Sequence, residues 1–337
     1  MQAAKMIRGR VVYVSPERML AAWGLGILES RDGGAAWKQI GLVPVSFLEK
    51  MVMSSGLSCR LLRKGVHHFA AGNSCALIVA NRDVYFMEGG EIRLLGPVHG
   101  SRPLALCAAN DAFYYGEYRS NPERSPVHIW KWDAAEKKWK AAWRFSGIRH
   151  VHGVFDDPYE NELWVATGDL DHEAGIWRTK DDFQTLEQVA GGSQRFRAVR
   201  LLFTRAHVYF GSDAPDEQNY IFRMDRKGNN VETLTAVGSS VFHGCKAGDH
   251  FFFSTGVEPS RVNITRHTEV WGSADGKNWQ VLRRFKKDIW PMKYFQYGQV
   301  LFPEGPGDGN NLWLTPLSTV HDQRTFKIPL ENLFKQE

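Results

Sequence analysis

An all-β fold made of repeated four-stranded units is the fold class that this 337-residue sequence predicts, on three observations. Short apolar segments of strand length alternate with turn residues along the chain. Trp (12) and Gly (32) are frequent, which favours strands joined by tight turns. One turn motif recurs about every 48 residues, a period typical of a four-stranded propeller blade. We therefore predict a seven-bladed β-propeller with antiparallel blades, forming a single domain over residues 1–337; six blades, with one unit misread, is the alternative.

The recurring turn is clearest in SRDGGAAW at residues 30–37. Gly accepts positive φ, and an Asp side chain can bind nearby backbone N–H groups, so this order of residues suits a tight hairpin. A second copy is SADGKNW at 273–279, and degenerate copies lie at 133–139, 179–186 and 225–231. The seven expected turn positions are Asp32, Glu88, Asp133, Asp181, Asp225, Asp275 and Asp322.

The segments between these turns alternate apolar and polar residues, as half-buried strands do. The fourth to sixth units are the easiest to divide. Their expected strands are 150–155, 162–167, 175–179 and 185–190, then 195–203, 207–212, 220–224 and 232–237, then 240–245, 250–255, 268–273 and 279–285. The unit between residues 45 and 100 has the weakest pattern.

The turn pattern S-x-D-x-G-x-x-W resembles the Asp-box of the BNR-repeat, sialidase-like propellers. Ser30, Asp32, Gly34 and Trp37 match it, and the copy at 273–279 matches with one residue deleted. The resemblance implies a propeller whose Asp-boxes are structural turns, on the face away from the family's active sites. Sialidases also carry a Phe/Tyr-Arg-Ile-Pro motif, which this sequence lacks, so the resemblance argues against sialidase chemistry. Residues 149–177 also resemble sialidase-like proteins of bacterial exopolysaccharide gene clusters.

Composition narrows the function classes. The net charge of +5 is spread along the chain, which favours a mildly basic surface over a nucleic-acid footprint. No apolar run is long enough for a membrane span, and the first residues lack the apolar core of a signal peptide. The 4 cysteines form no C-x-x-C pair. We therefore expect a cytoplasmic protein that has no nucleic-acid partner, and the oligomeric state stays open.

Function in a propeller is expected where the second strand of each blade passes into the third. Five consecutive units place a carboxylate there, mostly soon after a Gly. These carboxylates are Glu117, Asp169, Asp213, Glu258 and Glu304. Polar loops on a rigid scaffold often carry function, although acids at loop starts also occur as simple caps.

The first strands add basic residues to the same end. Aligning HVHGV, RFRAV and VFHGC puts His152, Arg197 and His243 in one column of the fourth, fifth and sixth units. With Asp169 and Asp213 these are the candidate catalytic residues. The candidate substrate-binding residues are Glu117, Tyr118, Arg119, His150, Arg195, Asn219, Glu258, Lys293 and Glu304.

Such a set fits cleavage of a glycosidic bond in an oligo- or polysaccharide. In hydrolysis, two carboxylates act as acid and as base or nucleophile. In β-elimination, His152 or His243 removes a proton while Arg197 neutralises a uronate carboxylate. We predict no cofactor; a divalent cation held by His150, His152, Asp169 and Asp171 is an alternative.

Two interpretations without catalysis stay open. A histidine on an inner strand is often a hydrogen-bonded core residue, and Arg197 can serve only to pair with Asp213. The protein is then a non-catalytic scaffold that binds a glycan or a protein partner, a role that the fold alone does not separate from catalysis.

Overall fold

The computed structural model describes residues 5–53, 55–133 and 136–334. Among them are seven four-stranded antiparallel sheets, the strand content of a seven-bladed β-propeller, which confirms the predicted fold. The chain divides into two compact units: residues 1–97, 244–257 and 266–337 form unit 1, and residues 98–243 and 258–265 form unit 2. The single domain over residues 1–337 stays a prediction.

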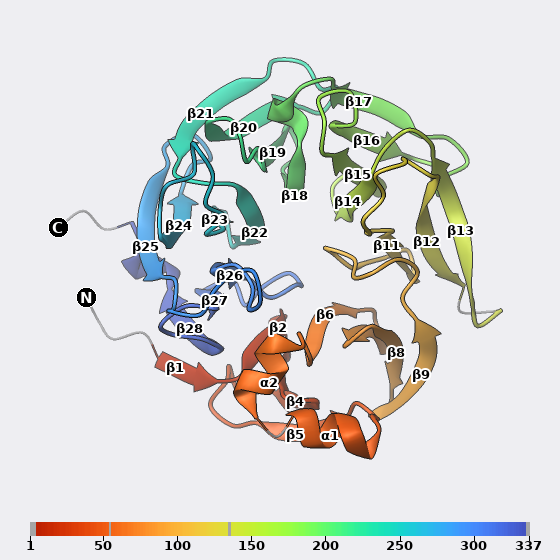
Figure 1. Cartoon of the computed structure of the whole chain (residues 1–337). Helices are drawn as coiled ribbons and strands as arrows, with labels where there is room; N and C mark the ends of the chain where they lie inside the picture. The colour runs from red at the N-terminus through yellow and green to blue at the C-terminus, as the bar shows by residue number, and fades with distance from the viewer. Residues whose placement is uncertain (1–4, 54, 134–135, 335–337) are drawn as a thin grey trace. The chain divides into compact units, whose positions relative to one another are not determined.

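Unit 1 holds three complete sheets and most of a fourth (Figure 1). The first two sheets are β2 (Arg10–Val14), β3 (Met19–Trp23), β4 (Gly26–Ser30) and β5 (Lys38–Leu42), then β6 (Val66–Ala71), β7 (Cys75–Ala80), β8 (Asp83–Glu88) and β9 (Glu91–Pro97). The last sheet consists of β26 (Gln299–Leu301), β27 (Asn311–Leu317), β28 (Arg324–Pro329) and β1 (Lys5–Arg8). Strands β23 (His250–Thr255), β24 (His267–Ser273) and β25 (Gln280–Lys286) also belong to this unit, and the short 3-10 helix η2 (Leu330–Asn332) follows β28.

The last sheet joins the two ends of the chain, because its outer strand β1 comes from the N-terminus and pairs with β28. The hydroxyl of Thr325 donates to the carbonyl of Gly9 at 2.7 Å and accepts from the N–H of Val11 at 3.1 Å. Asp322 therefore lies between the second and third strands of this sheet, and the expected turn between third and fourth strands at this residue is wrong. The sequence pattern misses this because the fourth strand is supplied from the other end of the chain.

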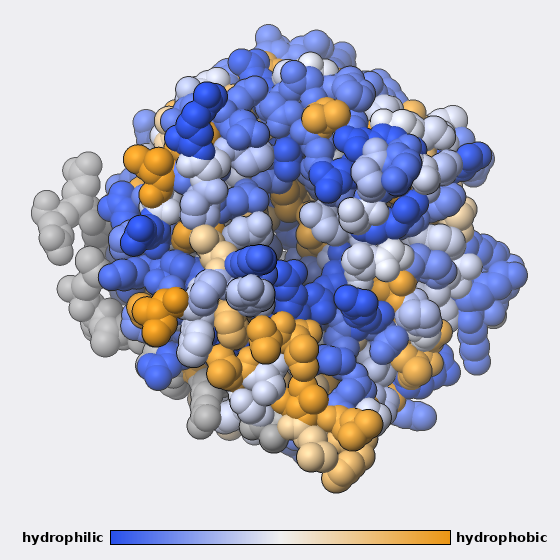
Figure 2. All heavy atoms as spheres, in the orientation of Figure 1, coloured by the Kyte–Doolittle hydropathy of each residue, from blue (hydrophilic) through white to orange (hydrophobic). Residues whose placement is uncertain are grey.

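Two helices that the sequence pattern does not predict precede the second sheet. They are α1 (Phe47–Met53) and α2 (Gly56–Leu61), and neither contains a buried residue. Figure 2 shows hydrophobic side chains gathered over them. The exposed apolar residues here are Phe47, Leu48, Met51, Leu57, Leu61 and Leu62. None of the helices among the described residues has the length and apolar content that a bilayer span requires.

Unit 2 holds the three central sheets, each formed in sequence order. They are β10 (Cys107–Ala109), β11 (Ala112–Gly116), β12 (Val127–Asp133) and β13 (Lys138–Phe145); β14 (His150–Asp157), β15 (Glu162–Gly168), β16 (Gly175–Thr179) and β17 (Glu187–Gly191); and β18 (Ala198–Phe203), β19 (His207–Ser212), β20 (Asn219–Asp225) and β21 (Glu232–Val237). Strand β22 (Val241–Ala247), which begins the sheet of β23 to β25, starts in this unit. Large apolar side chains such as Trp164 and Phe210 fill the space between the sheets.

One predicted strand of unit 2 is shorter than expected. Residues 194–196 form the 3-10 helix η1 (Gln194–Phe196), and β18 begins only at Ala198. The N–H of Phe196 donates to the carbonyl of Ser193 and that of Arg197 to the carbonyl of Gln194, so these groups close a turn instead of a sheet ladder. Arg197 therefore precedes the strand.

Apart from the one expected at Asp322, the recurring turns join the third and fourth strands of their sheets, as predicted. Ser30 donates its hydroxyl to Asp32 at 2.8 Å, and Asp32 Oδ1 accepts the N–H groups of Ala35 and Ala36 at 2.9 Å. Asp275 binds its own turn in the same way. These hydrogen bonds lower the pKa of the Asp32 carboxyl, because they stabilise its ionised form.

Candidate functional site

The candidate site lies in unit 2, at the ends of the second strands. Glu117 directly follows β11 and Asp169 directly follows β15, while Asp213 directly follows β19. Glu258 comes three residues after β23, within the segment 258–265 that belongs to unit 2. The predicted placement of these four carboxylates is confirmed.

The fifth carboxylate is misplaced by the sequence pattern. Glu304 follows β26, which is the first strand of its sheet, and its backbone bonds to Val12 and Val14. The apolar stretch before Glu304 resembles a second strand, but the real second strand is β27, after the Gly-rich loop. Lys293 lies between β25 and β26, so both residues belong to unit 1 and are not part of the site described here.

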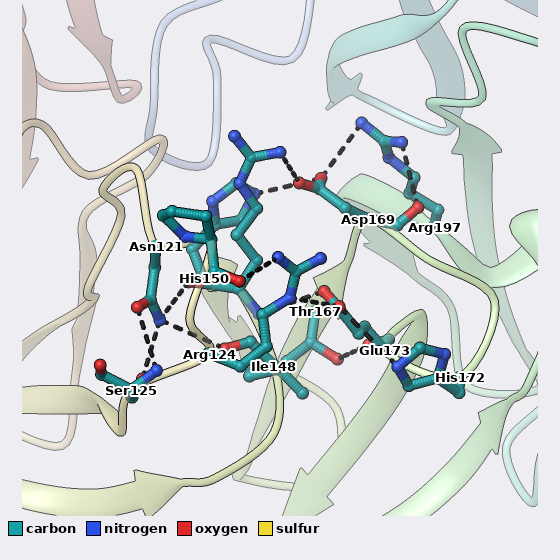
Figure 3. Close-up of polar contacts among 12 residues, drawn as sticks. Asn121, Arg124, Ser125, Ile148, His150, Thr167, Asp169, His172, Glu173 and Arg197 are labelled. Carbon is teal, nitrogen blue, oxygen red and sulfur yellow. Dashed lines mark hydrogen bonds and ion pairs between the residues drawn. The ribbon is translucent and has the colours of Figure 1, made fainter.

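Asp169 is the centre of the polar contacts in this part of unit 2. Its Oδ2 accepts from Arg149 Nη1 at 2.9 Å, and its Oδ1 lies 3.2 Å from Arg197 Nη2. The Nε2 atoms of His150 and His152 lie 3.3 Å and 3.8 Å from Oδ1. Figure 3 shows Arg197 and His150 directed at this carboxylate from different segments. Asp169 thus faces two guanidinium groups and two imidazoles.

These neighbours decide the charge of Asp169. Burial alone raises the pKa of the Asp169 carboxyl, but His150, His152 and the cation of Arg197 stabilise its ionised form more strongly. The net effect holds this pKa well below its usual range. Asp169 is therefore a permanent anion with few remaining lone pairs, which makes it a poor proton acceptor.

Both histidines have one ring nitrogen fixed by a backbone carbonyl. His152 Nδ1 lies 2.8 Å from the carbonyl oxygen of Ala198, and His150 Nδ1 lies 3.4 Å from that of Arg119. A carbonyl oxygen only accepts, so each Nδ1 carries the hydrogen. Burial lowers the pKa of His152, which keeps its ring neutral. In both rings Nε2 then faces the carboxylate of Asp169.

Asp213 has the opposite environment. Its pKa is raised to about 7 by burial; the cation of Arg197 opposes this rise, and the negative charge of Glu258 adds to it. Arg197 Nε lies 3.5 Å from Asp213 Oδ2, and the Ser240 hydroxyl stabilises the ionised form of Asp213. Ser240 also donates to Glu258 at 3.1 Å, which links the two acids. Asp213 therefore exchanges its proton near neutral pH.

Glycines at the ends of the second strands allow this close approach. A Cβ atom on Gly116 would lie 2.3 Å from Cγ1 of Val151, and one on Gly168 would lie 3.0 Å from Arg197 Cγ and 3.1 Å from His152 Cε1. Real Cβ atoms do not tolerate the first distance. The glycine before the acid therefore makes room for the segment that begins the next sheet. This explains why glycine and an acid recur together.

A second layer of buried polar groups holds the segment 148–150 in place (Figure 3). The buried carboxylate of Glu173 accepts from Arg124 Nε at 2.7 Å and from the N–H of Arg149 at 3.1 Å. Asn121 donates its amide to the carbonyls of Ile148 and Arg149 at 3.5 Å and 3.1 Å. Sequence reasoning missed Glu173, Asn121 and Arg124, because nothing in their local sequence separates them from surface loop residues.

Other predicted binding residues are committed to neighbouring protein groups. Glu117 accepts from Arg119 Nε at 2.7 Å, and its other oxygen accepts from the backbone and ring of His128 at 3.2 Å. Tyr118 packs against His150 with ring centroids 4.1 Å apart and ring planes tilted by 34°, and burial raises the pKa of Tyr118 to about 12. Of these residues Arg119, about a third exposed in its side chain, is the one most open to a ligand.

Two further candidates, Asn219 and Arg195, make contacts other than those of the Asp169–Asp213 network. Asn219 is fully buried and uses its amide to hold the loop at Ala214, so it shapes the loop and does not reach solvent. Arg195 lies over the ring of Phe222 and lines a cavity of about 330 Å³ beside β20. A third candidate, His243, is half-buried in β22.

A metal ion would find three ligand atoms in this network. One atom each of His150, His152 and Asp169 lies within 4.8 Å of the other two, and all three residues are buried. Asp171, the fourth residue of the cation alternative, is exposed and accepts from Gln194 at 3.1 Å instead.

The sequence matches no protein-family model, and no curated protein is similar to it in sequence. Several solved structures share the fold. One is an oligogalacturonate lyase in complex with manganese, with a TM-score of 0.63, 11% identity, and coverage of 98% of this chain and 95% of that chain. Another is a mitotic checkpoint complex, with a TM-score of 0.59, 10% identity, and coverage of 99% and 96%. The tricorn protease has a TM-score of 0.51 at 13% identity over 81% of this chain, which spans only 27% of the protease chain. These likenesses support the propeller fold alone.

Proposed function

We propose that the protein binds an acidic oligo- or polysaccharide at the strand ends of unit 2 and cleaves a glycosidic bond there, with Asp213 as the proton-transferring residue. The observation that carries the proposal is that two carboxyl groups contact the same guanidinium group but have opposite pKa shifts. Arg197 contacts both Asp169 and Asp213, yet the pKa of one carboxyl is lowered and that of the other is raised to about 7. Acids whose environments separate their pKa values in this way are typical acid–base pairs.

The arrangement favours hydrolysis over elimination. Asp213 is partly protonated at neutral pH and can donate to the glycosidic oxygen, as the general acid of a glycosidase does. The bond between the anomeric carbon and the glycosidic oxygen breaks, and the permanent negative charge of Asp169 stabilises the positive charge that develops on the sugar ring. Water then adds to the anomeric carbon and gives its proton to the Asp213 carboxylate, which restores the acid. For elimination, the expected base is His152 or His243; His152 is buried and both of its ring nitrogens face protein groups.

A different arginine takes the role of anion clamp. Arg197 directs its nitrogen atoms at Asp169 and Asp213, so it positions the two acids. Arg149 uses one nitrogen on Asp169 and leaves 40% of its side chain exposed. It is therefore the cation that can bind a uronate carboxylate. An oligogalacturonate lyase has the same fold, and the choice of an acidic saccharide for this chain is our proposal.

The alternative is a scaffold that binds a glycan or protein without catalysis. The observation in its favour is that Glu117, Asp169 and Arg197 bind protein groups on most sides, as structural networks do. Under this alternative Asp213 serves only to shape the loop, and its replacement leaves ligand affinity unchanged.

The test compares Asp213→Asn with Asp216→Asn, an exposed residue of the same loop. Both proteins and the parent are incubated with oligogalacturonates, alginate oligosaccharides and neutral xylo-oligosaccharides. New reducing ends report cleavage, and ultraviolet absorbance of unsaturated uronates separates elimination from hydrolysis. We expect hydrolysis of an acidic substrate by the parent and by Asp216→Asn, and a kcat lower by about 10²–10⁴-fold in Asp213→Asn. Binding without cleavage by all three proteins supports the scaffold instead.

A further inference from the structure

We propose that His150 Nε2, His152 Nε2 and one carboxylate oxygen of Asp169 bind a divalent transition-metal ion. This proposal goes beyond the saccharide cleavage proposed above; the two share Asp169, but the metal site rests only on how these three side chains converge. Two imidazoles and one carboxylate form a donor set that suits Zn²⁺, Mn²⁺, Co²⁺ or Fe²⁺ and leaves coordination positions open.

Strands β14 and β15 hold the three ligands in place. His150 and His152 lie two residues apart in β14, where the pairing with β15 shifts register between Val151 and Gly153, and their ring centroids are 5.2 Å apart. His150 pairs with Gly168 of β15, and Asp169 follows that glycine directly. Donor atoms of the three residues lie within 4.8 Å of one another. Sites built on strands keep their geometry better than sites on mobile loops.

Two Nε2 atoms and a carboxylate oxygen meet at this position. Each histidine donates Nδ1–H to a backbone carbonyl, and each Nε2 faces Asp169 Oδ1. Without a proton or a metal ion among them these three atoms are all acceptors, so the position suits a cation. His150 Nε2 is buried and has no hydrogen-bond partner within residues 5–53, 55–133 and 136–334. A buried acceptor without a partner destabilises the fold, so a cation at this position is favoured.

The carbonyl contacts also match what a metal ligand requires. A histidine that binds a metal usually donates its second ring nitrogen to a carbonyl or carboxylate, which fixes the tautomer and turns the other nitrogen to the ion. Ala198 and Arg119 supply these carbonyls for His152 and His150. The same pattern is therefore present for both rings.

Two nearby guanidinium groups act against a metal and limit its affinity. Arg149 lies on Asp169 Oδ2 at 2.9 Å, and Arg197 approaches Oδ1 at 3.2 Å. A carboxylate has about four lone-pair sites, so Oδ1 retains one for an ion. Arg149 is the more exposed of the two and has solvent-facing positions to move into. We therefore expect weaker binding than for the same ligands without neighbouring cations.

The competing occupant of this position is a proton on His150, which would make that ring an imidazolium paired with Asp169.

The experiment titrates untagged full-length protein, stripped with a chelator, separately with Co²⁺, Mn²⁺ and Zn²⁺. Visible absorbance follows Co²⁺ and calorimetry follows all three ions. We expect one saturable site per chain in the parent protein.

Ligand variants decide the assignment. His150→Gln and His152→Gln should each weaken Co²⁺ binding by more than about 100-fold, beyond the roughly 10–100-fold loss seen when a residue that is only hydrogen-bonded to a metal ligand is changed. The matched control His172→Gln changes an imidazole that is 72% exposed in its side chain and should bind as the parent does. Circular dichroism confirms that each variant is folded; where a glutamine variant is not, the matching asparagine variant replaces it. Absent binding in the parent, or equal binding in the folded His150 and His152 variants, overturns the site.

Discussion

The raised pKa of Asp213 makes a quantitative prediction about stability. The carboxyl changes from an ordinary 3.8 to about 7 in the folded protein, mainly because of burial. The folded chain therefore holds this proton more tightly than the unfolded chain between these two values. Stability from Asp213 is fully present below the unfolded pKa and is lost as pH rises through the folded pKa.

The size of the loss follows from linkage. The rise in the pKa of Asp213, by about three pH units, corresponds to about 4 kcal/mol in the free energy of unfolding, at about 1.36 kcal/mol per pH unit. Integrated only from pH 5 to pH 8, the same shift gives about 2.6 kcal/mol. Asp213 is 8% exposed, so solvent screening reduces this figure little.

Asp213→Asn removes the titration while preserving the shape of the side chain. We expect the free energy of unfolding of the parent, relative to this variant, to fall by about 2–3 kcal/mol from pH 5 to pH 8. Urea unfolding followed by tryptophan fluorescence measures the difference, and carbon NMR of labelled aspartates reads the pKa directly. Asp216→Asn, which is exposed, should show no such trend. A difference that stays constant between the two pH values, or an Asp213 carboxyl that titrates near pH 4, refutes the reasoning.

Two further substitutions test the support of the site. Glu173→Gln weakens a buried ion pair with Arg124, so we expect a loss of about 3 kcal/mol in the free energy of unfolding, measured in urea. Gly116→Ala places a methyl group 2.3 Å from Val151 Cγ1 and should lower the same free energy by about 1–3 kcal/mol. Gly56→Ala is the control, because nothing lies near its Cβ position; a loss equal to that of Gly116→Ala would contradict the crowding argument.

The repeat made most of the fold predictable. Side chains such as Asp32 and Asp275 bind only their own turns, so a short sequence is enough to specify each turn. Seven turns at a regular spacing then give the number of sheets. The pattern fails where a sheet is not continuous in sequence: Asp322 is misread because β1 supplies the outer strand from the other end of the chain.

The candidate site was predictable in position but not in chemistry. Asp169 and Asp213 each follow a second strand, and the sequence shows this. The sequence does not show that Arg197 joins the two acids, since that contact depends on the turn of η1 just before β18. It also gives no sign of Glu173, whose role comes from burial between distant segments.

The acid therefore recurs at the same position in each sheet, and the residues around it decide its role. Glu117 accepts hydrogen bonds from Arg119 and His128, so its charge is used within the protein. Asp169 faces two guanidinium groups and stays ionised, while Asp213 shares one of them at a longer distance and is buried. The same strand end thus gives a structural ion pair, a permanent anion and a proton carrier in three successive sheets. Because Asp213 exchanges its proton near neutral pH, a search for activity should begin there.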